Sequence, residues 1–365
     1  MTSQTFLVQK SSIAQTQWES GASAALAPGH IRLRIDVFSF TANNITYASF
    51  GDAMKYWDFY PRADSQGVIP VWGFATVTES LCEGIGLGER FYGYFPPANE
   101  VMLEPGKVSA TGFAITSGAR AQLAAVYNQY TRCSADPFYA HGSEAVQCVL
   151  RPLFMTSWLI DDFLADNAFF GSEAVMLSSA SSKTAYGTAY CLSQRPKSER
   201  PRIIGLTSTG NVAFCQSLGC YDEVLTYDQI QSLPENLACT YVDMAGNAAL
   251  RMQIHSYFKQ LAYSCAVGGT HVGELGGAKG LPGPKAVLFF APAQIAKRRT
   301  DWGPALMAER LVNAWAGFAK AVASSEPAWV QEQRVTRSGA QAAYAQLLEG
   351  RSDPRQAQVW YLNEE

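Results

Sequence analysis

Long apolar runs and a charge excess of one sign are both missing from this chain of 365 residues. No apolar stretch approaches the ~20 residues that a helix needs to cross a bilayer, and the opening MTSQTFLVQKSSI lacks the basic-then-apolar order of a secretory signal. The formal charge of −3 offers no basic surface for nucleic acid. We therefore expect a soluble, cytoplasmic protein that acts on a small molecule, without a membrane or nucleic-acid partner.

Cysteine pairs and histidine clusters are also missing. The eight cysteines stand singly, with no CxxC pair, and the four histidines are dispersed. A disulfide framework is typical of small secreted chains, and a zinc site needs clustered Cys or His ligands. We therefore predict buried free thiols and no metal site.

The first third of the chain contains strand-like patterns. Residues 31–44 alternate apolar and polar positions, and glycines punctuate two further strand-like segments, 70–80 and 86–96. Short strands with close turns are typical of a small β-barrel. Helical periodicity then appears over 119–130 and again over 150–167. The pattern predicts an antiparallel β domain followed by helix.

Beyond Phe170, strand and helix patterns alternate. Strands are expected at 174–179, 202–208, 222–227, 239–246, 263–273 and 285–292, and helices at 183–192, 211–219, 248–259 and from 304 to about 324. Such alternation implies right-handed crossovers and a parallel sheet that is buried on both faces. The tail, from Trp329 to Leu362, has a strand, helix, strand pattern.

The turn after the first of these strands is polar where glycines are usual. A dinucleotide-binding turn brings backbone N–H groups and a helix N-terminus to a pyrophosphate, and G-x-G-x-x-G normally builds it. Here the residues that could bind phosphate are Ser179, Ser181, Ser182, Lys183 and Thr184. One alternative is a polar helix N-terminus with a Ser or Thr cap. Another is the end of a P-loop, although that motif needs glycine where Leu177 and Ser182 stand.

Five segments in the same order along the chain carry a family resemblance: Val37–Tyr47, Gly86–Tyr94, Leu153–Trp158, Phe214–Tyr227 and Ala343–Arg351. Together they resemble the medium-chain dehydrogenase/reductase superfamily, and most of all its zinc-free, quinone-oxidoreductase-like branch. The resemblance implies an α/β protein with a GroES-like β-barrel domain (1–150), a Rossmann domain with a doubly wound parallel sheet (151–325) and a C-terminal return to the first domain (326–365). The missing turn glycines, and a segment at 289–303 without a counterpart, indicate a divergent branch.

Further cofactor contacts are expected where the later strands end. In place of the Asp or Glu that selects NAD, the strand at 202–208 ends in hydroxyl and amide side chains, and Lys183 with Arg200 or Arg202 would add positive charge. The alternative for each arginine is a solvated charge in a loop. We therefore predict NADP(H) as the cofactor. The remaining candidate contacts are Thr207, Ser208, Asn211, Asp243, Gly246, Gly269 and Phe290. Asp243 could instead be a turn residue.

Candidate proton donors come from the segment that, in the resemblance, faces the nicotinamide. They are Asn44, Tyr47 and Tyr56, together with His271 at a later strand end. Aromatic residues in such a stretch also serve as core, and His271 could be a buried structural histidine. The hypothesis is an NADPH-dependent, zinc-independent reductase of an enone, quinone or related carbonyl compound, and a homodimer would fit it. The alternative is a non-catalytic NADP(H)-binding protein, either a redox sensor or a structural relative.

Overall fold

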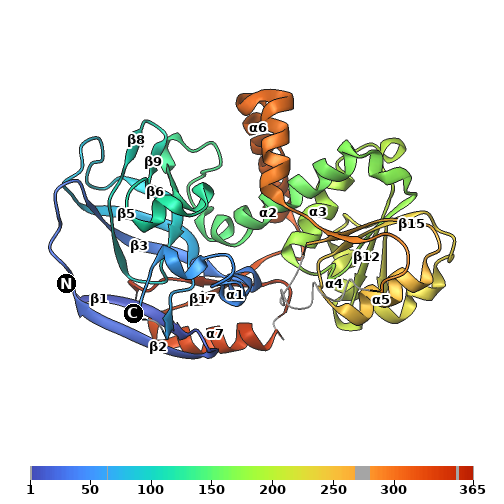
Figure 1. Cartoon of the computed structure of the whole chain (residues 1–365), viewed down its shortest axis with the longest axis horizontal. Helices are drawn as coiled ribbons and strands as arrows, with labels where there is room; N and C mark the ends of the chain where they lie inside the picture. The colour runs from blue at the N-terminus through green and yellow to red at the C-terminus, as the bar shows by residue number, and fades with distance from the viewer. Residues whose placement is uncertain (1, 64, 268–279, 351–352, 365) are drawn as a thin grey trace. The chain divides into compact units, whose positions relative to one another are not determined.

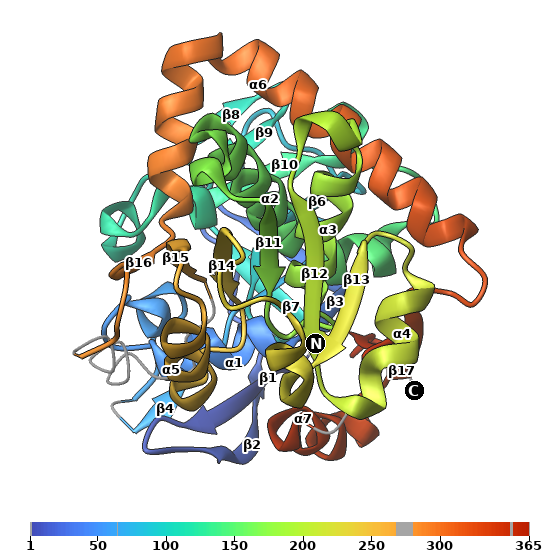
Figure 2. The same ribbon diagram turned by 90° about the vertical axis from the view of Figure 1, so that its right-hand side faces the viewer.

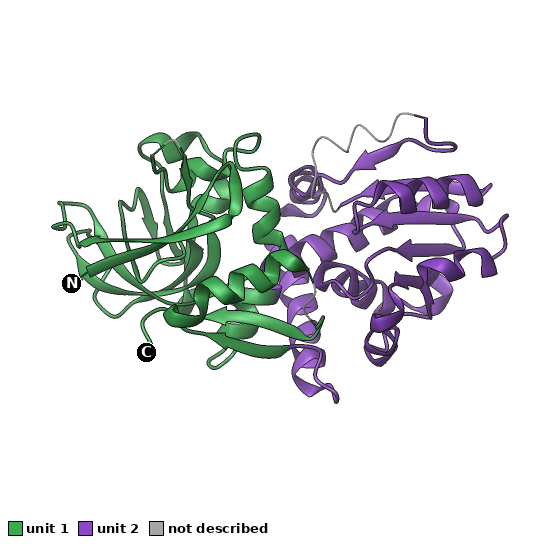
Figure 3. Ribbon diagram, turned by 90° about the horizontal axis from the view of Figure 1, so that it is seen from below, with its two compact units in different colours: residues 1–149, 331–365 green, residues 150–330 purple. Residues whose placement is uncertain are grey.

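The computed structural model describes the chain except residues 1, 64, 268–279, 351–352 and 365. It divides into two compact units, Met1–Val149 with Gln331–Glu365, and Leu150–Val330 (Figures 1 and 3). The C-terminal residues thus belong to the same unit as the N-terminal ones.

A nine-stranded, mainly antiparallel sheet forms most of the first unit, in the order β17-β18-β3-β5-β6-β10-β9-β8, with β7 also paired to β3. The strands are β3 Ile31–Phe40, β5 Val71–Ser80, β6 Arg90–Phe95, β7 Glu100–Leu103, β8 Lys107–Ser109, β9 Gly112–Ala114, β10 Gln129–Arg132, β17 Gln331–Val335 and β18 Gln356–Trp360. Since β18 pairs antiparallel with β3, placing Trp360 opposite Phe38, the end of the chain completes this sheet.

A smaller sheet and two helices cover an aromatic core in the same unit. The sheet has the order β2-β1-β4, with β1 Thr2–Gln9, β2 Ser12–Ala22 and β4 Gln66–Gly67. The helices are α1 Ala42–Ser49 and α7 Ala340–Glu349. Phe6 packs edge to face against Phe40 and Trp360, which are tilted against each other, and all three are almost completely buried. The sequence patterns predict no strand before about residue 25, so the hairpin β1–β2 is a finding of the structure.

The helix predicted over 119–130 is wrong. The segment forms two 3-10 turns, Ala119–Gln122 and Ala125–Asn128, and then enters β10. Arg120 Nε donates to Asn128 Oδ1 at 3.0 Å, and Asn128 Nδ2 donates back to the Arg120 carbonyl oxygen at 2.7 Å. These tertiary contacts outweigh the local helical periodicity, which is only a weak determinant by itself.

The second unit contains a six-stranded parallel sheet in the order β13-β12-β11-β14-β15-β16 (Figure 2). Its strands are β11 Ala174–Leu177, β12 Arg202–Thr207, β13 Glu223–Thr226, β14 Cys239–Asp243, β15 Leu261–Ala266 and β16 Ala286–Leu288. Every neighbouring pair is parallel. Counted along the chain the order is 3-2-1-4-5-6, which is a doubly wound sheet. The predicted α/β class is confirmed.

The helices that accompany this sheet are α3 Lys183–Ser193, α4 Val212–Ser217 and α5 Ala248–Tyr257, and two longer helices, α2 Glu144–Asp166 and α6 Ala291–Ser324, complete the set. Further 3-10 turns are Tyr56–Phe59, Cys133–Ala135, Ala168–Gly171, Lys197–Glu199, Thr209–Asn211, Tyr227–Ser232 and Arg337–Gly339. Helix α6 bends at Gly303, where φ is 78°. The expected start at residue 304 is therefore this bend, and the helix itself begins at Ala291, where the sequence predicts the end of a strand.

All eight cysteines carry free thiols, as predicted, and the predicted burial is confirmed for all of them except Cys82, which is half-buried. Within the described part of the chain, no helix combines the length and apolarity needed to cross a bilayer. Among the same residues, no three His, Cys, Asp or Glu side chains gather as metal ligands would.

Candidate functional site at the strand switch point

Strand β11 is the first strand of the doubly wound sheet and lies between β12 and β14 (Figure 2). The strand order reverses between β11 and β14, and ligands of such sheets bind outside the carboxyl ends of the strands at this switch point. Ser178 directly follows β11, and Asp243 is the last residue of β14. Both side chains are buried. They therefore stand at the place where the fold expects a ligand.

A single hydroxyl joins the two strand ends. Ser178 Oγ donates to Asp243 Oδ1 at 3.1 Å and accepts from the backbone N–H groups of Met244 and Ala245, at 3.0 and 3.1 Å. The Gly246 N–H donates to Asp243 Oδ1 at 2.9 Å, and Gly246 has φ 65°, which favours glycine. We call Ser178, Asp243 and the turn 244–246 the switch-point network.

Asp243 is compensated by an arginine. Arg251 of α5 donates from Nε and Nη2 to Asp243 Oδ2, at 2.8 and 2.7 Å, and Tyr241 Oη donates to Oδ1 at 3.0 Å. Asp243 is 0% exposed and Arg251 is 4% exposed. A buried carboxylate requires such a partner, because an unpaired charge in the interior is costly. Asp243 thus holds a turn, the alternative that the sequence leaves open.

The serine-rich turn keeps a glycine-like backbone without glycine. Ser179 has φ 50°, in the left-handed region that L-residues with a Cβ rarely adopt. Its N–H donates to Tyr227 Oη at 3.1 Å, and Ala180 N–H donates to the Leu206 carbonyl oxygen at 3.0 Å. These bonds from neighbouring segments hold the turn in its left-handed form.

Glycine is instead found on the adjacent strand. A Cβ atom at Gly205 of β12 would stand 2.9 Å from Tyr221 Cδ1 and 3.0 Å from the Cβ of Ala180. Tyr221 Oη donates to the Ala180 carbonyl oxygen at 2.7 Å. The close approach of turn to sheet therefore depends on a glycine that the motif G-x-G-x-x-G does not include.

The other serines of the turn have local partners. Ser182 is the N-cap of α3, and its Oγ accepts from the Ala185 N–H at 3.4 Å. Ser181 Oγ accepts from Asn211 Nδ2 at 3.0 Å. Lys183 and Thr184 are the first two residues of α3 and are half-buried. The cap interpretation thus describes Ser182, and the first turn of α3 lies beside β11 and β12, where a phosphate group would be expected.

The end of β12 presents hydroxyl groups. Thr207 is buried, whereas Ser208 is exposed and Asn211 is half-buried. Arg200 and Arg202 do not reach this end, because they lie at the amino end of β12, where Arg200 pairs with Asp222 and Arg202 with Glu223. The expectation that these arginines add charge near an adenosine ribose is therefore wrong.

Three candidates of the second unit remain: Gly269, His271 and Phe290. Phe290, the N-cap of α6, is 57% exposed. Gly269 and His271 lie outside the described residues.

In the first unit, the sequence candidates fall in a group of packed rings. Tyr47, Tyr56, Trp72, Tyr94 and Tyr127 are joined by ring centroid distances of 4.6 to 6.1 Å. We call these five residues the tyrosine cluster. The Tyr56 and Tyr127 hydroxyls are hydrogen-bonded at 3.1 Å. Tyr47 and Tyr56, predicted from separate positions, thus lie together.

The Tyr47 hydroxyl is surrounded by donors. It accepts from Asn43 Nδ2 at 2.7 Å and from Trp72 Nε1 at 3.4 Å. Burial raises the pKa of Tyr47 above its ordinary value of 10.0, and nearby Tyr56 raises it further, while the hydrogen bonds with Trp72 and Asn43 act in the other direction. Burial also raises the pKa of Tyr56. Both phenols are therefore protonated at neutral pH, the form in which a phenol donates.

The Asn44 side chain is used within the fold. Its Oδ1 accepts from the Thr41 N–H at 2.8 Å and from Thr41 Oγ1 at 3.1 Å, and its Nδ2 donates to the Pro70 carbonyl oxygen at 2.9 Å. Asn44 is buried. It closes the first turn of α1 and joins it to the segment before β5.

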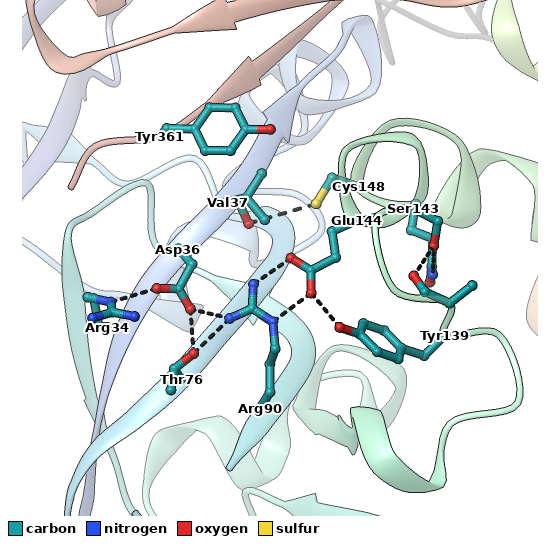
Figure 4. Close-up of polar contacts among 12 residues, drawn as sticks. Arg34, Asp36, Val37, Thr76, Arg90, Tyr139, Ser143, Glu144, Cys148 and Tyr361 are labelled. Carbon is teal, nitrogen blue, oxygen red and sulfur yellow. Dashed lines mark hydrogen bonds and ion pairs between the residues drawn. The ribbon is translucent and has the colours of Figure 1, made fainter. Parts of the chain in front are cut away.

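Two charged regions outside these sites are internally paired. In the first unit, Arg90 contacts Glu144 and Asp36, at 2.6 and 2.5 Å, and Thr76 and Tyr139 complete the network (Figure 4). Burial tends to lower the pKa of Arg90, but the hydrogen bond with Glu144 and the charge of Asp36 raise it above its usual value. This network anchors the start of α2.

In the second unit, a cleft of about 420 Å³ lies between α2 and α6. Its carboxylates are also paired: Asp161 with Arg195, and Asp162 with Arg298. The cleft is lined by Trp158, Asp161, Asp162, Ala165, Asp166, Arg195, Arg298, Trp302 and Arg310.

Comparison with known sequences identifies the family. The model of a family described as "Protein of unknown function (DUF2855)" matches residues 38–353. The chain belongs to this family. No curated protein matches it.

The fold of the DUF2855 chain is similar to that of several solved structures. The quinone oxidoreductase from Coxiella burnetii is 12% identical with a TM-score of 0.55, over 99% of this chain and 100% of that one. CurA from Vibrio vulnificus, in complex with NADPH, is 12% identical with a TM-score of 0.59, over 99% and 100%. The yhdH oxidoreductase from Salmonella enterica, in complex with NADP, is 12% identical with a TM-score of 0.52, over 98% and 99%. The predicted resemblance to quinone-oxidoreductase-like proteins is confirmed as a likeness of fold.

Sequence reasoning misses Ser178 and Arg251 at the switch point. In the tyrosine cluster and its surroundings it misses Asn43, Trp72, Tyr94 and Tyr127. Asn43 lies four residues before Tyr47 on α1, a spacing that brings side chains together on a helix. Trp72 lies in the strand-like segment 70–80, where the sequence predicts barrel core, and Tyr127 lies in the segment wrongly predicted as helix. Only a correct helix assignment for 42–49 could have indicated Asn43.

Proposed function

We propose that this DUF2855 protein is an NADPH-dependent, zinc-independent reductase that transfers hydride to an enone, quinone or related carbonyl compound. The observation that carries the proposal is the reversal of strand order between β11 and β14, with an ordered polar turn at its carboxyl end. The proposal is supported by structures of similar fold: one is named a quinone oxidoreductase, and two others contain bound NADPH or NADP.

The residues at the switch point fit a dinucleotide. Helix α3 has eleven residues, long enough to direct its N-terminal N–H groups and positive dipole end toward a pyrophosphate. Its first residue is Lys183. The stretch from Gly205 to Val212 has no acidic residue, so a 2′-phosphate would meet no repulsion beside Ser208 and Asn211. In this proposal the second unit binds the nucleotide and the first unit binds the substrate.

When bound, the nicotinamide supplies a hydride, and the protein must supply a proton and hold the substrate in position. We assign the proton to Tyr47. Its oxygen accepts from Asn43 and Trp72, so its own O–H can be directed at a substrate oxygen, and the two donors would stabilise the phenolate that remains after the transfer. Protonation of the developing enolate or alkoxide completes the reduction.

Cofactor binding and zinc content are the first tests. Titration of the full chain with NADPH and with NADH, followed by nucleotide fluorescence, should give tighter binding of NADPH, and equal affinity would contradict the assignment. Elemental analysis should find no tightly held zinc. One equivalent per chain would contradict zinc independence.

Turnover is tested with a panel of enones and quinones, by following NADPH oxidation. Tyr47→Phe should lower kcat on the order of 10²-fold, because it removes only the hydroxyl, and should leave NADPH affinity unchanged. Tyr344→Phe is the matched control, since its hydroxyl contacts the Ile13 carbonyl oxygen and lies outside the tyrosine cluster. Normal turnover with reduced thermal stability in Tyr47→Phe would place Tyr47 in the core.

A nucleotide-binding protein without turnover is the second candidate function. The observation that favours it is the burial of Tyr47, which is only 6% exposed, because a proton donor has to reach its substrate. Tight NADPH binding with no oxidation across the whole panel would select this alternative, a redox sensor or a structural relative.

A further inference from the structure

The switch-point network places one buried hydroxyl between the two halves of the doubly wound sheet. Strands β11, β12 and β13 form one half, and β14, β15 and β16 form the other. Ser178 and Asp243 are 65 residues apart in sequence and meet at 3.1 Å across the reversal of strand order. Each half of such a sheet binds one mononucleotide of a dinucleotide. The contact therefore links the carboxyl end of β11, in the first half, to the turn 244–246 that follows β14, in the second half.

Ser178 uses its hydroxyl completely. Its two acceptor positions take the N–H groups of Met244 and Ala245, and its proton goes to Asp243. Because Ser178 is fully buried, water cannot replace these bonds. The orientation of residues 244–246 consequently depends on this one side chain, and the carboxylate of Asp243 adds the third N–H, that of Gly246.

The charge of Asp243 does not oppose an anionic ligand. Arg251 lies on its other oxygen at 2.7 Å, so the pair is close to neutral when seen from the strand ends. The turn 244–246 thus has its backbone N–H groups held in place, next to a carboxylate whose charge Arg251 compensates.

We propose that Ser178 is a positioning residue, which orients the turn 244–246 to receive the nicotinamide half of NADPH. The inference rests on the proposed nucleotide binding. It assigns to Ser178 a role that G-x-G-x-x-G does not describe, because the side chain acts across the sheet on the fourth strand, whereas the motif's glycines act through their own backbone.

The test compares two serines and two ligands in the full chain. Ser178→Ala removes the hydroxyl at the carboxyl ends of β11 and β14. Ser172→Ala is the matched control, because Ser172 Oγ bonds Thr240 Oγ1 at 2.9 Å and so joins the segments at the opposite ends of the same two strands. Calorimetric titration uses NADPH and adenosine 2′,5′-bisphosphate, which lacks the nicotinamide half.

The expected result is selective. Ser178→Ala should weaken NADPH binding about tenfold, because the ligand would have to order a turn that has lost its anchoring hydroxyl, and should leave the affinity for adenosine 2′,5′-bisphosphate unchanged. Ser172→Ala should bind both ligands like the wild type. Unchanged NADPH affinity in Ser178→Ala, or equal losses for both ligands or in both variants, would overturn the inference. If the wild type bound neither ligand, the proposed function itself would fail.

A second measurement needs no variant. Hydrogen exchange of the wild-type protein without nucleotide should find the amides of Met244, Ala245 and Gly246 protected, since each has a buried acceptor. Rapid exchange of these three amides would show that the turn is not held in advance and would overturn the inference, even if Ser178→Ala failed to fold.

Discussion

In the tyrosine cluster, hydroxyl groups are carried on large rings that pack against one another, with centroids 4.6 Å apart for Tyr47 and Tyr56 and 4.7 Å apart for Tyr94 and Tyr127. At the switch point, the side chains are small and bind backbone N–H groups instead. Ring volume therefore sets the geometry of the first site, and hydrogen bonds set that of the second. The loss of a hydroxyl in the tyrosine cluster should therefore lower the free energy of unfolding less than the loss of a polar partner at the switch point.

The largest expected effect is on the charged pair of the second site. Asp243→Asn should lower the free energy of unfolding by about 3 to 5 kcal/mol, because Arg251 would be left buried without an anion. Urea unfolding of the full chain measures the change. Glu364→Gln is the control: it removes the exposed partner of Arg334 and should cost no more than about 1 kcal/mol. If Asp243→Asn lowered the free energy of unfolding by less than about 1 kcal/mol, the expected difference between a buried and an exposed ion pair would be refuted.

Two tyrosines of the first unit sharpen the comparison. Tyr60 Oη donates to the Tyr94 carbonyl oxygen at 2.6 Å and accepts from Arg120, so Tyr60→Phe should cost about 1 to 2 kcal/mol. Tyr94 Oη is buried and has no hydrogen-bond partner among the described residues. Tyr94→Phe should therefore be neutral or should stabilise by up to about 1 kcal/mol. Chemical unfolding of both variants is the measurement, and the reverse order would mean that Tyr94 Oη is satisfied in solution.

The left-handed serine gives a smaller effect. Ser179→Gly relieves a backbone conformation that costs about 1 kcal/mol for a residue with a Cβ, although glycine adds entropy to the unfolded chain. Ser181→Gly carries the entropy cost without that relief, and it also removes the Oγ that accepts from Asn211 Nδ2. We expect Ser179→Gly to be more stable than Ser181→Gly by about 1 kcal/mol in thermal unfolding. Equal stability of the two variants would mean that the turn at Ser179 is not strained.

The smallest effect depends on pH. The pKa of Tyr47 is raised above 10.0 in the folded chain, chiefly by burial. The unfolded chain ionises first, so the contribution of Tyr47 to stability is complete below pH 10 and is lost as pH rises above it. At pH 10 the loss is about 0.4 kcal/mol. Unfolding curves from neutral to alkaline pH should fall less steeply for Tyr47→Phe than for the wild type, and identical slopes would mean that Tyr47 titrates normally when folded.

Local patterns predicted much of the second unit. The alternation of apolar strands and helices after Phe170 gives the parallel sheet, and Ser182 caps α3 as a serine before a helix should. In the first unit, β3, β5 and β6 form where the sequence has alternating or apolar segments. The hairpin β1–β2 and the 3-10 turns near Arg120 have no comparable local signal, since pairing and buried hydrogen bonds determine them.

By itself, then, the sequence determined the elements whose causes lie within a few residues: strand alternation, helix periodicity, caps and the polar turn after β11. Only the tertiary structure decided which polar groups meet. It brought Ser178 to Asp243, Tyr47 to Trp72, and Arg200 to the amino end of β12 rather than to its carboxyl end. The physical reason is that a hydrogen bond depends on distances in space of about 3 Å, while sequence patterns record only the periodic burial of neighbouring residues.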